Sequence, residues 1–330
     1  APQSAPATAR KTNLLTLSAH SPEALEQACN NLAEFLDEPD APSPGAVAHT
    51  LQTGRKALPY RLTINGEDHA TVVKALRNAT ITTAQTAASE KRRVAFMMTG
   101  HGSQSTTMTR ALLAQEPVFR KRFDELASVL KTRTNIDLYA VLSSSDPGWA
   151  QSQLDRMMVS QPLMYVIQLA LCALWKSWGV TPETVIGHSS GEFAAAFEAG
   201  IFSAEDGLKL VLARGQLMDT SIAGGMIALN YDEHEIKHFI GSNLSVGVIN
   251  APDMCVVSGE EKYLNDFIAL LEERDVDYRR LHVSRAAHSP TMEAIQPAFA
   301  EIAKTIRYRA PETRYISSVT GKPADPDEIA

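Results

Sequence analysis

One serine in this 330-residue chain stands in a setting that favours nucleophilic chemistry. Ser189 lies at the centre of Gly187–Gly191, which has the pattern Gly-x-Ser-x-Gly. The apolar pair Val185 and Ile186 precedes it as a short buried strand, and a helical stretch follows directly. A strand–turn–helix connection exposes the serine hydroxyl at a helix N-terminus, where the N–H of Ser190 faces a developing oxyanion. A chance match in a loop would lack these flanking elements, so the pattern predicts a serine that holds an acyl group.

A serine hydroxyl is a poor nucleophile unless a neighbouring base takes its proton. The chain has nine histidines that could serve. His188 adjoins Ser189, but we expect its side chain to point away across the turn and to support the turn. His288 lies in the small-residue segment Ala286–Pro290. From the residues alone, His288 is either an exposed loop histidine or the base.

Arg214 interrupts the apolar stripe of a predicted helix. The stretch Ser203–Met218 starts with a capping box formed by Ser203 and Asp206. The positions one turn before and after the arginine are all apolar: Leu210, Val211, Leu217 and Met218. A guanidinium on such a stripe needs a partner, because an unpaired buried charge is costly. The partner is either a buried Asp or Glu, or a substrate carboxylate that the guanidinium grips in two places.

The bulk composition excludes several classes of function. A length of 330 residues with 44% hydrophobic residues allows two or three domains with a substantial core. The net charge of −7 argues against a nucleic-acid binder. The longest apolar stretch, around Leu163–Trp175, is interrupted by Gln168, and we interpret it as a buried helix rather than a membrane span. The three cysteines have no metal-ligand spacing and no signal peptide is evident, which indicates a cytoplasmic protein with free thiols.

The elements that position these residues begin with a small α+β module at residues 1–90. Residues 1–10 are rich in Ala, Pro and Ser, and 85–91 are largely polar, so both segments are predicted linkers. Between them the pattern predicts a strand at Leu14–Leu17, a helix that starts at Ser21-Pro22, a second helix, a strand at 60–64 and a third helix.

Two further parts complete the predicted organisation. Residues 91–222 and 286–330 form a large α/β part with a parallel sheet, because Val94–Met98 is a continuous apolar run typical of a buried parallel strand. Residues 223–285 show strands and helices in the order βαββαβ, which predicts a ferredoxin-like unit inserted into the large part.

Six short segments, in order, resemble the acyltransferase domains of modular polyketide synthases and the malonyl-CoA:carrier-protein transacylases of fatty acid synthesis. That family carries a Gly-Gln-Gly-x-Gln turn, a Gln-Pro helix start, a Gly-His-Ser-x-Gly-Glu elbow, an Arg-Gly-x-x-Met helix, an Asn-Ser-Pro-like turn and a His-Ser-Pro-x-Met segment. The corresponding segments here are Gly100–Gln104, Gln161-Pro162, Gly187–Glu192, Arg214–Met218, Asn250-Ala251-Pro252 and His288–Met292. The resemblance extends over roughly Val94 to Gly321 and implies an α/β-hydrolase-like fold for the large part. Residues 1–90 resemble the linker between a ketosynthase and its acyltransferase.

The resemblance implies a catalytic role for four residues. Ser189 attacks the thioester of an acyl-CoA, with His288 as general base. The backbone N–H groups of His101 and Ser190 form the oxyanion hole. His288 then deprotonates the phosphopantetheine thiol of an acyl carrier protein, which takes the acyl group in a ping-pong cycle. No metal or redox cofactor is needed. The implied partners are acyl-CoA, the carrier protein and a neighbouring ketosynthase domain, with no nucleic acid and no membrane.

Substrate recognition is implied for a second group of residues. Arg214 binds the free carboxylate of a malonyl-type group, and Gln161 and Asn250 help to form the substrate site. The specificity segment, often His-Ala-Phe-His or Tyr-Ala-Ser-His in the family, is Arg285-Ala286-Ala287-His288 here. Ala287 leaves space for a substituent on the acyl α-carbon, and we expect Arg285 to add a cation near the entrance. Malonyl is the default acyl unit, and a substituted or polar malonyl unit stays open.

Two other departures from the family matter. The first Gln of the Gly-Gln-Gly turn is His101 here, which keeps the backbone N–H but changes the side-chain contacts. The family also continues for several tens of residues beyond the end of this chain, with elements that usually orient the catalytic histidine. The chain is therefore expected to be one piece of a large synthase, and activity of this piece alone is not assumed.

Two other functions are compatible with the serine motif. A serine esterase or thioesterase of the α/β-hydrolase type would place an acidic residue between the serine and the histidine, where Asp206, Asp219 and Asp253 lie without a distinctive context. A catalytically silent docking module of a synthase is the other alternative. Arg214 and the inserted βαββαβ unit favour transfer.

Overall fold

The computed structural model describes residues 11–81, 92–281 and 283–329, and the chain divides into two compact units, residues 1–92 and 93–330. The predicted linkers at 1–10 and 85–91, and the predicted boundary near residue 90, lie outside the described residues.

The first unit is a two-stranded antiparallel sheet packed against three helices. Strand β1 (Asn13–Ala19) pairs with β2 (Tyr60–Gly66). The helices are α1 (Pro22–Leu36), α2 (Pro44–Gly54) and α3 (His69–Arg77). Helix α1 starts as predicted, with Ser21 accepting a hydrogen bond from the Ala24 N–H and Pro22 in the first turn. Leu15, Leu25 and Val72 are almost fully buried in a core drawn from this unit alone.

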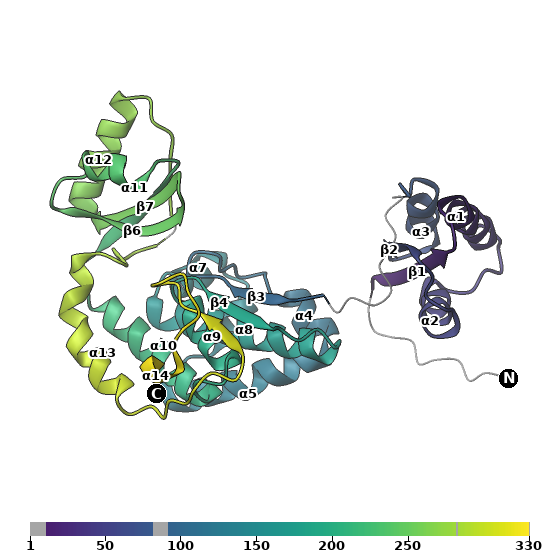
Figure 1. Ribbon diagram of the computed structural model, residues 1–330. Helices are drawn as coiled ribbons and strands as arrows, with labels where there is room; N and C mark the ends of the chain where they lie inside the picture. Colours follow the sequence, from purple (N-terminus) through teal and green to yellow (C-terminus); the bar gives the residue numbers. More distant parts are fainter. Residues whose placement is uncertain (1–10, 82–91, 282, 330) are drawn as a thin grey trace. The chain divides into compact units, whose positions relative to one another are not determined.

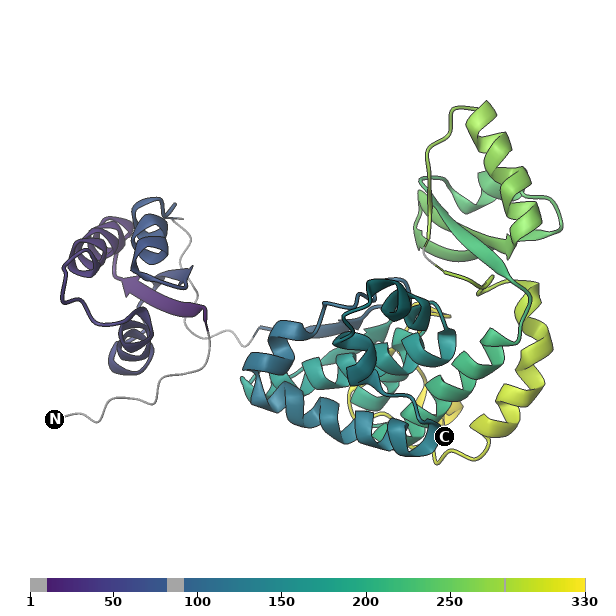
Figure 2. The same cartoon turned by 180° about the vertical axis from the view of Figure 1, so that it is seen from behind.

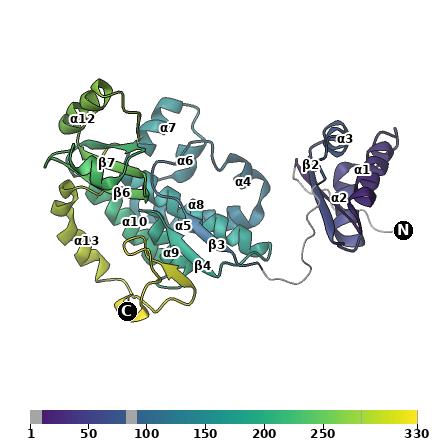
Figure 3. The same ribbon diagram turned by 45° about the horizontal axis from the view of Figure 1, so that its top comes forward.

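The second unit is built on a three-stranded parallel sheet with the strand order β3-β4-β9. The strands are β3 (Ala95–Met98), β4 (Thr184–Gly187) and β9 (Arg314–Ile316). Helices surround this sheet (Figures 1 and 3). Their bounds are α4 (Arg110–Gln115), α5 (Pro117–Thr134), α6 (Leu138–Leu142), α7 (Pro147–Leu154), α8 (Met157–Ser177), α9 (Gly191–Glu198), α10 (Ala204–Asp219), α13 (Gln296–Ala303) and α14 (Pro326–Ile329), with the 3₁₀ helix Pro290–Ile295 before α13.

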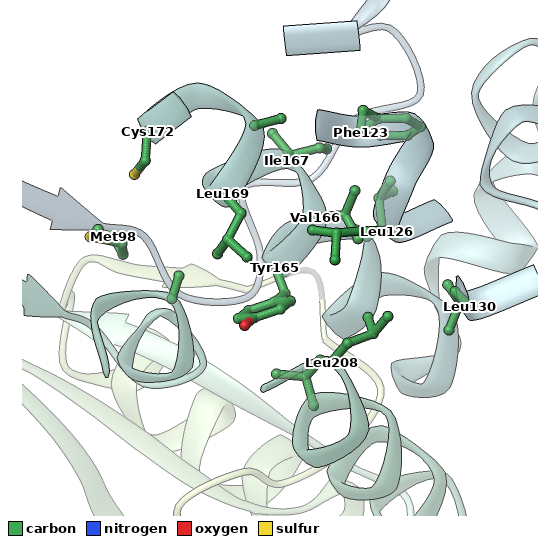
Figure 4. Packing of buried hydrophobic residues seen from close by; sticks show 14 of the residues in the cluster. Met98, Phe123, Leu126, Leu130, Tyr165, Val166, Ile167, Leu169, Cys172 and Leu208 are labelled. Carbon is green, nitrogen blue, oxygen red and sulfur yellow. The ribbon is translucent and has the colours of Figure 1, made fainter. Parts of the chain in front are cut away.

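Helix α8 is the centre of this core. By length and composition alone this helix could cross a membrane, although its apolar run looked too short for that in the sequence. However, 83% of its most apolar window is buried inside the protein. Its side chains point toward Phe123 and Leu126 of α5 on one side, and Tyr165 lies beside Leu208 of α10 (Figure 4). The Asp219 carboxylate accepts the N–H groups of Met157 (2.9 Å) and Met158 (3.0 Å) at the start of α8. A carboxylate there satisfies the free N–H groups and stabilises the positive end of the helix dipole.

Helices α8 and α10 pack closely because glycines of α10 face α8. A Cβ atom on Gly215 would collide with the backbone carbonyl of Met157, and one on Gly207 would collide with the Tyr165 ring. The same close packing fixes the position of Arg214 along α10 relative to the start of α8. The helix that carries the arginine is thus positioned by backbone contact.

The small sheet is inserted between α10 and the C-terminal segment, and it has the predicted order βαββαβ. Its elements are β5 (Gly224–Leu229), α11 (Glu233–Lys237), β6 (Leu244–Ala251), β7 (Met254–Glu260), α12 (Glu261–Glu273) and β8 (Tyr278–Arg280). All pairs are antiparallel in the order β6-β7-β5-β8, so the first and third strands lie in the middle, as in a ferredoxin-like sheet. Figure 2 shows α12 beside this sheet. Helix α11 is shorter than the predicted 233–240, and β8 ends before the predicted 283, with residue 282 outside the described part.

Candidate active site

Ser189 sits on a sharp turn between β4 and α9. Its φ of 52° lies in the left-handed region, where a non-glycine residue is strained. The two glycines of the motif are required because a side chain at either position would collide with a neighbouring backbone. A Cβ atom on Gly187 would collide with the Glu192 backbone, and one on Gly191 with the Met98 carbonyl. The turn is therefore held tightly against the end of β3 and presents the serine hydroxyl beyond the sheet.

The structure brings Ser189 and His288 together, although they are 99 residues apart in sequence. Ser189 Oγ lies 2.7 Å from His288 Nε2. Burial lowers the pKa of His288 below its ordinary value of 6.5, and the positive charge of Arg214 and the neighbouring His188 lower it further. At neutral pH the imidazole is therefore uncharged and able to accept a proton from the serine.

No carboxylate among the described residues bonds to His288. Asp206 caps α10 with Ser203, and Asp219 caps α8. Asp253 lies in the tight turn between β6 and β7. The three acidic residues weighed for a hydrolase triad thus have other places in the fold. This arrangement is a Ser–His pair without an acidic third member in the described ranges.

Two backbone donors flank the serine. The N–H groups of Ser190 and His101 donate no hydrogen bond within the part of the chain that the structure describes. Gly100 packs against His188 and the Ser189 Cβ, so the turn at residues 100–104 lies directly beside the elbow. Both donors are available for an oxyanion, and the oxyanion hole implied by the family resemblance stays a prediction.

Arg214 lies in the same site with no acidic partner. Its Nη1 donates to Gln161 Oε1 at 2.8 Å, and no Asp or Glu of the described ranges forms an ion pair with it. Burial lowers the pKa of Arg214 to about 10, so the guanidinium stays charged at neutral pH. Gln161 is held in turn by the Met218 sulfur, 3.1 Å from its Nε2. The salt bridge weighed for Arg214 is absent from these residues, which leaves a charged donor facing the cavity.

A cavity of about 640 Å³ joins these groups. Ser189, His288, Arg214 and Gln161 line it, with Ala287. Its apolar wall comes from residues of α8, α10 and the small sheet, namely Met157, Met218, Met226, Ala228, Val248 and Val256. Methionine side chains adapt their shape readily, so this wall can fit more than one acyl group.

The prediction that Arg285 adds a cation near the entrance of the substrate site is wrong. Its guanidinium donates to the Asp219 backbone carbonyl at 2.7 Å, and Arg285 does not line the cavity. The cavity is instead lined by Arg279 and Arg280, at the end of β8. Sequence reasoning missed both, although two consecutive arginines at the end of a strand of the inserted unit were visible. Arg280 pairs with Glu261, so Arg279 is the freer cation.

Three polar side chains complete the site. His188 points toward the small sheet, and its Nε2 lies 3.0 Å from Asn250 Oδ1. Asn250 lines the cavity, but this contact occupies its amide oxygen. His101 Nε2 lies 2.8 Å from Ser160 Oγ, and burial, with the nearby Arg214 charge, lowers the pKa of His101 to about 4. The His101 ring is therefore neutral and takes no part in charge balance at neutral pH.

Comparison with known protein families assigns both units. The acyl transferase domain model matches residues 95–330, and a model described as CurL-like, PKS C-terminal, matches residues 13–76. The chain belongs to the acyltransferase domains of polyketide synthases. The predicted family and the α/β fold class are thereby confirmed, including the resemblance of the first unit to a synthase linker.

Individual relatives give the same result. The acyltransferase domain from module 8 of the salinomycin polyketide synthase is 31% identical, with a TM-score of 0.81 over 97% of this chain and 78% of that chain. The malonyl CoA-acyl carrier protein transacylase from Burkholderia pseudomallei is 30% identical, with a TM-score of 0.62 over 71% of this chain and 81% of that one. The phenolphthiocerol synthesis polyketide synthase type I Pks15/1 from Mycobacterium marinum is 34% identical over 94% of this chain. This chain spans 15% of that protein's length.

Proposed function

We propose that this domain loads a malonyl-type extender unit from acyl-CoA onto Ser189 and then onto the phosphopantetheine thiol of an acyl carrier protein. One observation carries the proposal. Arg214, a charged arginine with no acidic partner among the described residues, faces the same cavity as the hydrogen-bonded Ser189 and His288. A site that holds an acyl carbon at the serine and a carboxylate at the arginine fits a dicarboxylic acyl group.

The chemistry proceeds in two half-reactions. Ser189 Oγ attacks the thioester carbon while its proton passes to His288 Nε2, and the oxyanion is stabilised by the N–H groups of His101 and Ser190. The C–S bond breaks, the proton goes to the coenzyme A sulfur, and an acyl ester remains on Ser189. The carrier-protein thiol then attacks the ester, His288 takes the thiol proton and returns it to Ser189, and the acyl group leaves on the new thioester. No step requires a metal or a redox cofactor.

The α-carbon of the acyl unit has room for a substituent. Ala287 contributes only a methyl group to the cavity wall, and the methionines that also line the cavity can adapt to the occupant. We include malonyl and substituted malonyl units in the substrate class for this reason. The polar malonyl unit inferred from Arg285 loses its support, because that guanidinium is bound to the Asp219 carbonyl.

The partners follow from the chemistry and from the first unit. The acyl donor is a coenzyme A thioester, and the acceptor is an acyl carrier protein of the same synthase. A ketosynthase domain is the proposed neighbour of residues 1–90. We place the reaction in the cytoplasm, where the buried free thiols of Cys29, Cys172 and Cys255 would stay reduced.

The nucleophile is tested by intact mass after mixing with malonyl-CoA. We expect the wild-type chain to gain one malonyl group, stable until a pantetheine thiol is added, and Ser189→Ala to gain none. Ser190→Ala, which keeps its backbone N–H, is the matched control and should still be acylated. Acyl mass on Ser189→Ala would refute the nucleophile, and loss of the acyl group in water alone would favour an esterase. A wild-type chain that gains no mass would favour the docking module.

The carboxylate role is tested by competition among acyl-CoAs. Replacing Arg214 with Ala removes the only charged group proposed to bind the malonyl carboxylate, so loading of malonyl-CoA should fall by roughly a hundredfold or more relative to acetyl-CoA, given the strength of charged hydrogen bonds in a buried site. The ratio of malonylated to acetylated protein by mass is the measurement. Arg279→Ala is the control cation and should keep the wild-type ratio. An unchanged ratio in Arg214→Ala would contradict the proposed role of Arg214 in binding the malonyl carboxylate.

A further inference from the structure

Strand β6 of the small sheet is irregular at two positions. Its pairing with β7 shifts between Val246 and Val248, and again between Ile249 and Ala251. The residues passed over are Gly247 and Asn250. A bulge turns one residue out of the regular ladder, and bulges are frequent next to active sites because they redirect a side chain or the backbone.

The first bulge lies against the histidine loop. A Cβ atom on Gly247 would come within 3.1 Å of His288 Cβ and 3.2 Å of its carbonyl oxygen, so this strand passes directly beside the histidine backbone. Next to it, the fully buried Ser258 of β7 donates its hydroxyl to the Ala287 carbonyl at 2.5 Å. The peptide that leads into His288 is therefore held by the small sheet. His288 keeps a φ of 60° there, a strained value that needs such support.

The second bulge lies against the serine turn. Asn250, the residue passed over, places its Oδ1 3.0 Å from His188 Nε2. His188 directly precedes Ser189, and its backbone N–H is bound to the Met98 carbonyl at 2.9 Å. Strands β6 and β7 thus contact the His288 loop through Gly247 and Ser258, and β6 contacts His188, the residue before Ser189, through Asn250.

We propose that β6 and β7 align Ser189 with His288, and that Ser258 and Asn250 are positioning residues for their hydrogen bond. This inference rests on the proposed Ser–His chemistry and gives Asn250 a new role, toward His188 rather than toward substrate. The physical reason is that the pair comes from two separate loops, each with a strained residue, so their hydrogen bond depends on how the two loops are held relative to each other. A shift of the order of 1 Å between reacting groups costs roughly a hundredfold in rate, so a common support for both loops has a large effect.

The experiment measures Ser189 reactivity without any acyl substrate. A fluorophosphonate reagent forms an O–P bond with Ser189 Oγ, the P–F bond breaks, fluoride leaves, and the serine proton passes to His288 and then to water. The labelling rate as a function of pH, followed by intact mass, reports both alignment and the titration of His288. In Ser258→Ala we expect the plateau rate to fall roughly tenfold or more. The pH midpoint should also rise, because a released loop exposes His288 to water and moves it away from Arg214, whose charge lowers its pKa, and from His188.

Controls separate this inference from a general loss of stability. Ser245→Ala removes a hydroxyl from β6 directly opposite Ser258 and should label at the wild-type rate and midpoint. Thermal unfolding of each variant is measured in parallel. If Ser258→Ala does not fold, the exposed Asn250→Ala carries the test, with the same expected fall in plateau rate.

The outcomes distinguish this inference from the proposed function. A wild-type chain that labels at Ser189, with a folded Ser258→Ala or Asn250→Ala variant that labels at the wild-type rate and midpoint, would overturn the alignment role alone. A wild-type chain that fails to label at Ser189 would contradict the nucleophile itself, and the inference would fall with it.

Discussion

Ser189 and His288 both hold their backbones in the left-handed region, at φ values of 52° and 60°. Apart from glycine, the only others among the described residues are Asn135 and Asp275, types that tolerate this conformation because their short polar side chains bond locally. Within the described ranges, Ser189 and His288 have no such local bond to offset the left-handed conformation, which costs about 1 kcal/mol or more for each residue. The strain is thus concentrated at the two residues that meet, and the surrounding packing must hold it.

The titration of His288 predicts how acylation depends on pH. The proposed base, His288, can accept a proton only when it is uncharged, and its pKa is lowered by burial, by the Arg214 charge and by the neighbouring His188. The rate of Ser189 malonylation should therefore be constant at neutral pH and fall as the pH drops through a midpoint below 6.5. The measurement is single-turnover acylation, followed by mass, from pH 4.5 to 8. A midpoint above 6.5 would contradict the direction of the shift.

At this scale the sequence was informative about residue types and less so about directions. Ser189 and Arg214 could be predicted from their neighbours, because a Gly-x-Ser-x-Gly turn and an apolar helix stripe are local patterns. The base could be chosen among nine histidines only through the family resemblance, since its partner is 99 residues away. Arg285 was misplaced because it lies in an irregular loop, where no periodicity tells which way a long side chain turns.

At the scale of elements, the contact between α8 and α10 sets the position of Arg214. Replacing Gly215 with Ala would push a methyl group into the Met157 carbonyl. We expect a loss of about 1–3 kcal/mol in the free energy of unfolding, from overpacking of a backbone contact. Urea denaturation checks this value. Gly54→Ala, at an open position at the end of α2, is the control and should be neutral or slightly stabilising. Equal stability of the two variants would show that α8 and α10 can move apart freely.

The order of elements in the second unit was predictable because strands and helices alternate with clear apolar periods. The two bulges of β6 were not, since an extra residue in a strand leaves the same apolar letters in the sequence and only its partner strand reveals the shift. The apolar length of α8 was equally ambiguous, because burial inside a protein and burial in a lipid bilayer select the same side chains.

At the scale of the whole molecule, the two units have separate hydrophobic cores. The first core is drawn from residues of the first unit, and the cores of the second unit lie on its large sheet and its small sheet. A domain folds cooperatively around its own core, so the units can unfold independently.

Calorimetry of the intact chain should therefore show more than one unfolding transition. Leu15→Ala, at a fully buried position of the first unit, should lower one transition by the equivalent of about 2–5 kcal/mol and leave the other unchanged. Phe123→Ala, in the second unit, should do the reverse. Ser189 labelling in Leu15→Ala should keep the wild-type rate. A single transition displaced by both substitutions would mean that the units fold as one.

Asp219 has a consequence for exchanging parts between relatives. Its carboxylate closes the start of α8, and its carbonyl receives the Arg285 guanidinium at the root of the loop that ends in His288. One residue thus ties three segments that are far apart along the chain. If residues 285–288 were exchanged for those of another synthase, a different residue would replace Arg285 next to the Asp219 carbonyl. Asp219 and the start of α8 would remain unchanged. A design that exchanges residues 285–288 should therefore treat residue 219 and this loop as one unit.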